Sequence, residues 1–479
     1  MNFGNKLSEF LSSSNMKAAE VCRKTGLSKS YFSKMKNGIM LPQDLGKVRD
    51  IANAMNLNHD ETTQICEAYK KDKLEEKFIN IEKSLKKILN LNEYRDNDAE
   101  SLEFSDMKLF NGQAIKGKEN VYNALHLIIK NSKAFTNSIL SDCNAEIFKV
   151  INQSLTLKNN LFKFHQLIYL DNNEYERNFK CFSEIMPMIL SGKVFTKYLY
   201  TNINKMHSFS LFPSILLNED ELLLISSDYS VALYMNSADA VSEYSDYFTE
   251  KYKSAAYFCV MFESIGSFIK GCSEIFTESE KNIPIDFYVI KRNPCVMLEG
   301  TSSIVQEHIC DESIDDNFVE NYMDFLLKNT IKNVKRYNIL FSSKGMDEYF
   351  SKEIYYEYNK YIDCPVSFEL RKNAFESFFN NAKRSNSIQV GLLADSFFQE
   401  PRHCINIWSD GKLLVILNFE KCYRIIILRE KTIVNGIVEY FDELKSLKFI
   451  LSKRETLNIM NQKLKSILNN GSDKNGGKL

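Results

Sequence analysis

Several features of membrane, secreted and metal-binding proteins are missing from this sequence. No apolar run approaches the ~20 residues that a membrane helix needs. The first residues, MNFGNKLSEF, lack the apolar core of a signal peptide. None of the eleven cysteines stands in a CxxC pair, the spacing typical of zinc sites. We therefore expect a cytoplasmic protein with no membrane partner, whose cysteines are buried thiols and not metal ligands.

The sequence also lacks the motifs of common enzyme classes. The phosphate-binding patterns GxGxxG, GxxxxGKS and GxxxxGKT do not occur, and neither does GxSxG or HExxH. Adjacent His403 and Cys404 fall in an expected strand, where neighbouring side chains point to opposite faces. The six histidines are too dispersed for a metal cluster: His59, His126, His165, His207, His308 and His403. We expect no enzymatic activity, no catalytic residue, no metal and no cofactor.

Proline is scarce and aromatic residues are abundant. Seven Pro stand against 34 Phe and 24 Tyr in 479 residues, and 44% of the residues are hydrophobic. This composition excludes general disorder and supplies the cores of two or three domains. The net charge of −1 does not exclude a nucleic-acid partner, because a small basic domain can lie within a neutral chain.

Positive charge is concentrated in one short stretch near the N-terminus. Residues 17–38, KAAEVCRKTGLSKSYFSKMKNG, contain one acid, Glu20. The same stretch contains six basic residues: Lys17, Arg23, Lys24, Lys29, Lys34 and Lys36. Lysine ammonium groups neutralise phosphates and release counterions, so this stretch is suited to nucleic acid.

Apolar spacing predicts five short helices between residues 3 and 70. The first spans about 3–13, the second about 17–24 and the third about 29–36, and two more follow Pro42. The side chains expected to face inward in the first three are Leu7, Phe10, Leu11, Ala19, Val21 or Cys22, Phe32 and Met35. The sequence therefore predicts a small all-α domain.

The second and third of these helices are joined by a short turn. Gly26 suits the left-handed conformation that ends a helix, and Ser28 is a favourable N-cap for the next one. Two short helices joined by a glycine turn, with polar donors on the second, are typical of a helix-turn-helix. We favour DNA binding over a merely solvated basic face, because the helix pattern, the turn and the one-sided charge agree.

Residues 3–70 resemble the Xre family, the Cro and phage-repressor type of helix-turn-helix. The resemblance is carried by Ala19, Val21, Gly26-Leu27-Ser28, Phe32, Met35, Asn37-Gly38, Pro42, Ile51, Ala52, Met55 and Leu57. It implies a recognition helix in the major groove of double-stranded DNA, and dimers on operators. The family commonly has Gln where this chain has Lys17 and Glu where it has Lys36, and both departures favour phosphate contact.

The resemblance assigns roles in DNA binding to individual positions. Ser28, Lys29, Ser30 and Lys34 match base-facing or groove-edge positions, and Lys17 and Asn37 match backbone-contacting positions. The full set of predicted DNA-binding residues is Lys17, Ser28, Lys29, Ser30, Tyr31, Ser33, Lys34 and Asn37.

A heptad pattern follows the helical domain. Its apolar positions are Leu74, Phe78, Ile81, Leu85 and Ile88. The pattern indicates either a connector helix that packs on the C-terminal part of the chain or a short parallel coiled coil. The polar, aperiodic run that follows is the predicted linker.

From about residue 107 the pattern predicts α/β or α+β structure. Asp410-Gly411, between two of the expected strands, is a hairpin signal. The expected strands are 163–170, 221–226, 229–235, 337–343, 387–394, 403–409, 412–419 and 423–429.

The order strand, helix, hairpin, helix occurs twice in this region, which raises an internal duplication as a hypothesis. The two halves resemble the phospholipase D-like duplication as a fold analogy. That activity needs an HxK pair, whereas His207 is followed by Ser208 and Phe209, so the resemblance implies no catalytic role here.

The predicted fold is multidomain: an all-α five-helix helix-turn-helix domain, then a large α/β (α+β) region, with two similar lobes left open. The predicted segments are 1–73 (helix-turn-helix), 74–91 (connector), 92–106 (linker), 107–280 (first lobe), 281–468 (second lobe) and 469–479 (disordered tail). We expect a bacterial, homodimeric transcriptional regulator whose C-terminal region senses a small-molecule or protein effector or mediates assembly. The alternatives are an enzymatic or defence-type effector fused to a DNA-binding autoregulator, and a protein-interaction module.

Overall fold

A computed structural model of the 479-residue chain contains two compact units, each discontinuous in sequence. The first unit comprises Met1–Lys83, Ile269–Gly411 and Ile437–Leu479, and the second comprises Ser84–Phe268 and Lys412–Gly436. The units thus do not follow the predicted lobe boundary at 280/281. The structure describes residues 2–14, 16–89, 102–159, 161–172, 174–201, 210–262, 285–294, 296, 334–351, 366–398, 405–409, 414–418 and 424–472.

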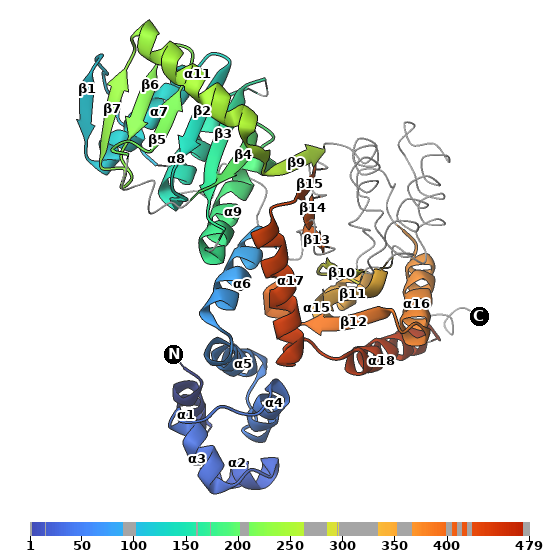
Figure 1. The fold of residues 1–479 in the computed structure, drawn as a ribbon. Helices are drawn as coiled ribbons and strands as arrows, with labels where there is room; N and C mark the ends of the chain where they lie inside the picture. Colours follow the sequence, from blue (N-terminus) through green and yellow to red (C-terminus); the bar gives the residue numbers. More distant parts are fainter. Residues whose placement is uncertain are drawn as a thin grey trace. The chain divides into compact units, whose positions relative to one another are not determined.

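The first unit begins with the short helices that the sequence predicts (Figure 1). They are α1 (Phe3–Ser13), α2 (Ala18–Thr25), α3 (Lys29–Lys36), α4 (Leu45–Ala54) and α5 (His59–Lys73). Leu7, Phe32 and Met35 are buried, as predicted. Ala19 is exposed, so its predicted inward position is wrong: the short α2 buries Val21 and Cys22 instead.

Helix α6 (Glu76–Leu89) carries four of the five heptad positions, and Leu74 lies before it as the C-cap residue of α5. All five apolar residues of the pattern are buried in the single chain, with at most 6% of any residue exposed. The ring of Phe78 packs against Tyr440 of α17 (Lys431–Ser446), with 6.4 Å between ring centroids. The Tyr440 hydroxyl donates to Glu82 Oε2 at 2.8 Å, and Lys70 Nζ of α5 lies 2.6 Å from the same oxygen. The apolar positions of α6 are therefore occupied by packing within the chain.

The described part of the rest of the first unit contains four paired strands. They are β10 (Ile285–Ile290), β11 (Val334–Ser342), β12 (Ile388–Leu393) and β13 (Ile405–Ser409). The pairings β10–β11 and β11–β12 are parallel, and β10–β13 is antiparallel. Helices α15 (Ser343–Ser351), α16 (Phe368–Arg384) and α18 (Lys453–Ser472) pack with these strands, and η2 (Asp395–Phe397) follows β12. Helix α18 continues past residue 469, the predicted start of the tail.

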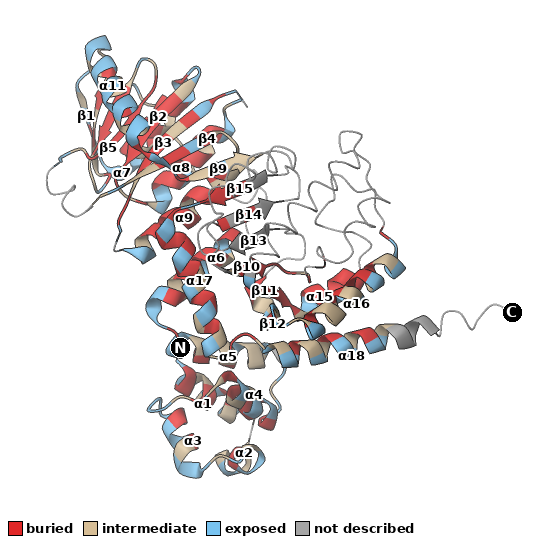
Figure 2. Ribbon diagram, turned by 45° about the vertical axis from the view of Figure 1, so that its right-hand side comes forward, coloured by how far each residue is buried: buried red, intermediate tan, exposed pale blue. Residues whose placement is uncertain are grey.

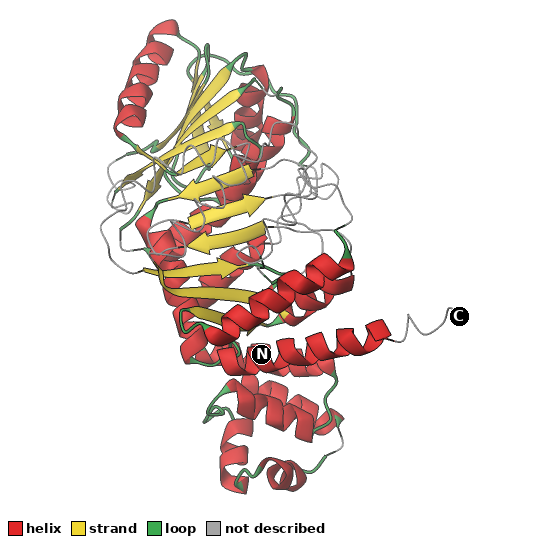
Figure 3. Cartoon of the chain, turned by 90° about the vertical axis from the view of Figure 1, so that its right-hand side faces the viewer, coloured by secondary structure: helices red, strands yellow, loops and turns green. Residues whose placement is uncertain are grey.

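The second unit contains an eight-stranded sheet in the order β1-β7-β6-β5-β2-β3-β4-β8. Its strands are β1 (Gln113–Lys116), β2 (Phe135–Leu140), β3 (Lys163–Leu170), β4 (Val194–Tyr200), β5 (Ser214–Leu217), β6 (Leu222–Ile225), β7 (Val231–Met235) and β8 (Ala256–Tyr257). Its helices are α7 (Lys118–Asn131), α8 (Ala145–Thr156), α9 (Tyr175–Leu190) and α11 (Ala238–Ser254). Figure 3 shows α11 on one face of this sheet and other helices on the opposite face. Val241 and Phe248 of α11 join the buried core over β2, β3, β5 and β6.

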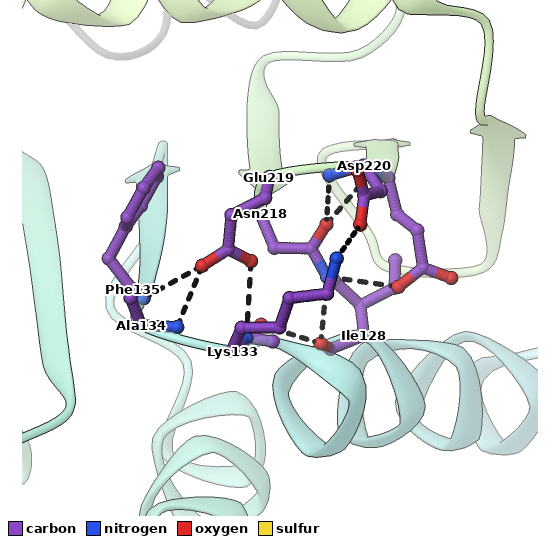
Figure 4. A network of polar contacts seen from close by, with 9 residues as sticks. Ile128, Lys133, Ala134, Phe135, Asn218, Glu219 and Asp220 are labelled. Carbon is purple, nitrogen blue, oxygen red and sulfur yellow. Dashed lines mark hydrogen bonds and ion pairs between the residues drawn. The ribbon is translucent and has the colours of Figure 1, made fainter.

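The turn between β5 and β6 is tied to the start of β2 (Figure 4). Glu219 Oε1 accepts hydrogen bonds from the backbone N–H groups of Ala134 at 2.7 Å and Phe135 at 3.1 Å. Lys133 Nζ lies 2.8 Å from Asp220, and the Asn218 amide donates to the carbonyl of Ile128 at 3.1 Å. Burial raises the pKa of Glu219, but these backbone donors outweigh it and hold the pKa below its usual value. The carboxylate thus fixes the position where β2 enters the sheet.

The strand arrangement of the eight-stranded sheet recurs later in the chain. In both segments three strands run parallel, β2–β3–β4 and β10–β11–β12. The first strand of each set pairs antiparallel with the strand that follows the set, β5 or β13. An antiparallel hairpin then follows, β6–β7 or β14 (Leu414–Asn418) with β15 (Arg424–Leu428). Its last strand pairs with a strand from before the repeat, β1 or β9 (Cys259–Phe262), and leads into α11 or α17. This shared topology is what the duplication hypothesis expects.

The structure differs from the sequence-based predictions about the cysteines and the linker. Cys143 and Cys181 form a disulfide with Cα atoms 4.9 Å apart, so the prediction that the cysteines are free thiols is wrong for this buried pair. Part of the predicted 92–106 linker is fixed, because the Leu102 N–H donates to Gln153 Oε1 at 3.0 Å and the Phe104 ring stacks on His126. His207, the His403–Cys404 pair and the Asp410-Gly411 turn lie outside the described residues.

Candidate nucleic-acid interface

The turn between α2 and α3 has the geometry that its residues predict. Gly26 ends α2 with φ 71°, a left-handed conformation that costs glycine little. Ser28 then caps α3, because its side chain accepts a hydrogen bond from the Tyr31 N–H at 3.2 Å. The two helices are thus joined by a turn of three residues, Gly26, Leu27 and Ser28.

Most predicted DNA-binding residues lie on the outer side of this arrangement (Figure 2). Phe32 and Met35 of α3 are buried, which turns the opposite side of the helix to solvent. The exposed predicted residues are Ser28, Lys29, Ser30, Ser33, Lys34 and Asn37, together with Lys17 at the start of α2. The structure therefore gathers seven of the eight predicted positions on accessible surface.

Tyr31 differs from the other predicted residues. It is half-buried, and its hydroxyl donates to the backbone carbonyl of Leu41 at 2.9 Å. This bond fastens the segment after α3 to the helix. In the structure Tyr31 thus stabilises the local fold, and its hydroxyl proton is engaged in the hydrogen bond to Leu41.

Positive charge extends beyond the predicted residues. Arg23, Lys24 and Lys36 are also exposed. Lys24 Nζ lies 3.7 Å from Glu20 and donates to the carbonyl of Ala54 at 3.2 Å, so part of its charge is neutralised locally. This surface can bind an anionic polymer through several lysines and can donate or accept hydrogen bonds through serines.

Two apolar side chains on this surface had no sequence signal. Ile39 and Met40, directly after Gly38, are 69% and 42% exposed. Their exposure depends on the left-handed Gly38, with φ 71°, which turns the chain away from the core. Apolar residues after a helix are more often buried, so sequence spacing alone could not single them out.

Helix α1 packs against α3. Gly4 of α1 packs so closely on the end of α3 that a Cβ added there would lie 2.8 Å from the backbone nitrogen of Gly38 and 2.9 Å from the carbonyl oxygen of Met35. On α5, Asp72 accepts a hydrogen bond from the Phe3 N–H at 2.8 Å. Helix α3, which carries the exposed residues, is therefore held in place by close packing against α1.

Among the residues that the structure describes, no group of three or more His, Cys, Asp or Glu side chains could hold a metal ion. No helix among the same residues is both long and apolar enough to cross a membrane.

Comparisons with known proteins give no family. No protein-family model matches the chain, and no curated protein matches it. Among solved structures, the archaeal chromatin protein TrmBL2 is 16% identical over 43% of this chain and 69% of its own, with a TM-score of 0.24. A polyphosphate kinase from Porphyromonas gingivalis is 11% identical over 69% of this chain and 49% of its own, with a TM-score of 0.23. A phosphatidylserine synthase from Haemophilus influenzae is 10% identical over 83% and 98%, also with a TM-score of 0.23. At these TM-scores none of the three carries an argument about fold or function.

Proposed function

We propose that this protein is a sequence-specific DNA-binding transcriptional regulator whose α2–turn–α3 segment is a helix-turn-helix. The proposal rests on the observation that α3 has one buried side and one exposed, polar side. Phe32 and Met35 fill the core, while Lys29, Ser30, Ser33 and Lys34 are exposed together. An exposed helix with lysine and serine donors fits the major groove, where such groups can contact phosphates and base edges.

In this proposal α3 is the recognition helix and α2 lies across the DNA backbone. Lys17, at the start of α2, would contact phosphate, as would Asn37 after α3. The protein would act as a homodimer on operators with two half-sites, because one short helix reads too few base pairs to be specific. The remainder of the chain would sense an effector or mediate assembly. No observation on the described residues favours the enzymatic or protein-interaction alternative, which stays a prediction.

Genome-wide footprinting of the full-length protein beside a Lys29→Ala/Lys34→Ala double variant tests this proposal. We expect discrete palindromic sites for the unmodified protein. In a binding assay on one such site we expect the double variant to lose about 10- to 100-fold in affinity and to show a smaller salt dependence. The matched control is Lys335→Ala/Lys465→Ala, which removes the same charge from exposed positions outside the N-terminal helices and should leave the footprints unchanged.

Two results would contradict the proposal. Diffuse, salt-sensitive binding that is the same in both double variants would mean that α3 reads no sequence. Absence of DNA binding by the folded full-length protein would overturn the function itself.

A further inference from the structure

A cavity of about 870 Å³ lies within the first unit, between the N-terminal helices and the paired strands. Helix α4 contributes residues from its first turns, and β11 and β12 contribute residues from the sheet. The end of α17 and the segment leading into α18 complete the lining. Its volume is that of a typical small-molecule site.

The lining of this cavity is strongly basic. It contains two carboxylates, Asp44 and Glu455, against six cationic side chains: Arg49, Arg336, Lys445, Lys448, Lys453 and Arg454. Asp44 is already paired with Lys448 at 2.8 Å, and Arg336 is paired with Asp286, which does not line the cavity. Among the described residues no carboxylate pairs with Arg49 or Arg454, and Arg49 interacts with the Cys66 thiol. The cavity therefore holds an excess of positive charge in a chain whose net charge is −1.

Lys445 is the most enclosed of these cations and is held by polar groups from the sheet. Its Nζ donates to Asn338 Oδ1 at 2.6 Å and to the Tyr288 hydroxyl at 3.3 Å. Burial lowers its pKa to about 8; the Arg336 cation adds to this effect, while the carboxylates of Asp442 and Asp286 oppose it. An anion in the cavity would relieve this electrostatic cost.

The other residues of the lining limit which class of ligand can bind. Among the described residues that line the cavity there is no aromatic ring, so they offer a nucleobase no stacking partner. Leu340, Val390, Ile450 and Leu451 form the apolar part of the wall, which can contact the uncharged part of a ligand. The site therefore fits a compact molecule whose recognition is dominated by several negative charges.

We propose that this cavity binds a small molecule carrying two or more phosphate groups. Arg49 of α4 and Arg454 of α18 bind the phosphates, and Lys445 of α17 and Arg336 of β11 bind them from other parts of the lining. Guanidinium groups are suited to this because their forked donors match phosphate oxygens.

The position of the cavity also suggests how ligand binding changes DNA affinity. This step rests on the proposed DNA-binding function. The Asp44–Lys448 pair joins α4 to the turn after α17 at the cavity wall. A polyanion competes with Asp44 for Lys448 and adds a contact from Arg49. Ligand binding thus changes how the N-terminal helices are held, which couples it to DNA affinity.

Isothermal titration calorimetry of the full-length protein with inorganic tripolyphosphate, at constant ionic strength and pH 7, tests the site. We expect saturable binding that weakens at least tenfold in Arg49→Gln/Arg454→Gln. The matched control Lys335→Gln/Lys465→Gln removes the same charge from exposed positions that do not line the cavity and should bind within twofold of the unmodified protein. Absence of binding, or equal weakening in both variants, would overturn the site.

DNA affinity measured with and without tripolyphosphate separates this inference from the proposed function. We expect at least a fivefold change in the unmodified protein and none in the Arg49/Arg454 variant. An equal change in both would mean that the anion competes with DNA at α2 and α3, which overturns the coupling. If the protein binds no DNA at all, the proposed function fails, and the calorimetric result alone decides the anion site.

Discussion

At the scale of single residues, Gly4 shows how one missing side chain sets the position of the proposed recognition helix. Its Cα lies against the backbone at the end of α3, with Gly38 and Met35 as neighbours. Both neighbours are backbone atoms, which cannot rotate away as a side chain could. A larger residue at position 4 must therefore displace α1 or α3.

Gly4→Ala should lower the free energy of unfolding by about 1–3 kcal/mol, because overpacking against fixed backbone outweighs the better helix propensity of alanine. Urea denaturation followed by circular dichroism measures the change. The neighbouring Asn5→Ala, at an exposed position of α1, should stay within about 0.5 kcal/mol of the unmodified protein. A Gly4→Ala protein as stable as Asn5→Ala would show that the close approach does not exist in solution.

At the scale of elements, α6 illustrates a pattern with two physical solutions. A heptad of apolar residues can pack on a second copy or on its own chain, and both bury the same side chains. In the structure the side that carries Phe78 and Ile81 is buried within the chain, and Phe78 contacts Tyr440. The buried Tyr440–Glu82–Lys70 group fixes the same helix by polar contacts.

Ile81→Ala should lower the free energy of unfolding by about 2–5 kcal/mol through loss of buried area and a residual cavity. Because α6 packs within its own chain, we expect the loss to be independent of protein concentration in thermal unfolding. Lys83→Ala, on the exposed side of α6, serves as the control and should have little effect. A loss of stability that grows on dilution would instead favour the coiled coil.

At the scale of the whole molecule, the N-terminal helices are joined to segments hundreds of residues away in sequence. Lys448 pairs with Asp44, the Tyr69 ring packs on Phe449 with 5.7 Å between centroids, and the Ser396 hydroxyl donates to Glu67 at 3.2 Å. These contacts explain why residues 1–83 belong to one compact unit with the C-terminal residues. They also provide a route by which the cavity can influence α3.

The Asp44 contact should give the stability of the protein a defined pH dependence. Hydrogen bonds from Lys448 and from the Lys47 N–H lower the pKa of Asp44 below its usual 3.8. Its contribution is therefore complete above the unfolded-state value and is lost as pH falls through the folded-state value. Asp44→Asn, which keeps an N-cap residue, should have a lower Tm than the unmodified protein at pH 7, by no more than a few degrees, and this difference should shrink as the pH falls below about 4. Asp50→Asn, on the same helix, is the control; a Tm difference for Asp44→Asn that is as large at pH 3 as at pH 7 would rule out the carboxylate as its source.

Strand β2 is one of the strands that the sequence pattern did not predict. Strand β2, FTNSIL, has no apolar run, because the polar Asn137 and Ser138 interrupt it. Both are nevertheless buried in the sheet, where Asn137 has His165 as a polar neighbour. Periodicity detects strands by apolar side chains, so a buried polar strand leaves no signal. All eight strands that were predicted do occur, since their runs of Leu, Ile and Val identify them locally. The cavity could not be predicted for a different reason: its cations come from four elements and one turn, spread between residues 49 and 454.

The sequence by itself determined what depends on neighbouring residues. The apolar spacing fixed the short N-terminal helices, Gly26 and Ser28 fixed the turn between α2 and α3, and the gathering of basic residues predicted which side of α3 would be charged. Only the tertiary structure decided whether α6 packs on its own chain, that Tyr31 serves the fold, and that Arg49, Lys445 and Arg454 meet in one cavity. Local conformation follows from short-range sterics and hydrogen bonds, whereas these outcomes depend on which distant segments the chain buries against one another.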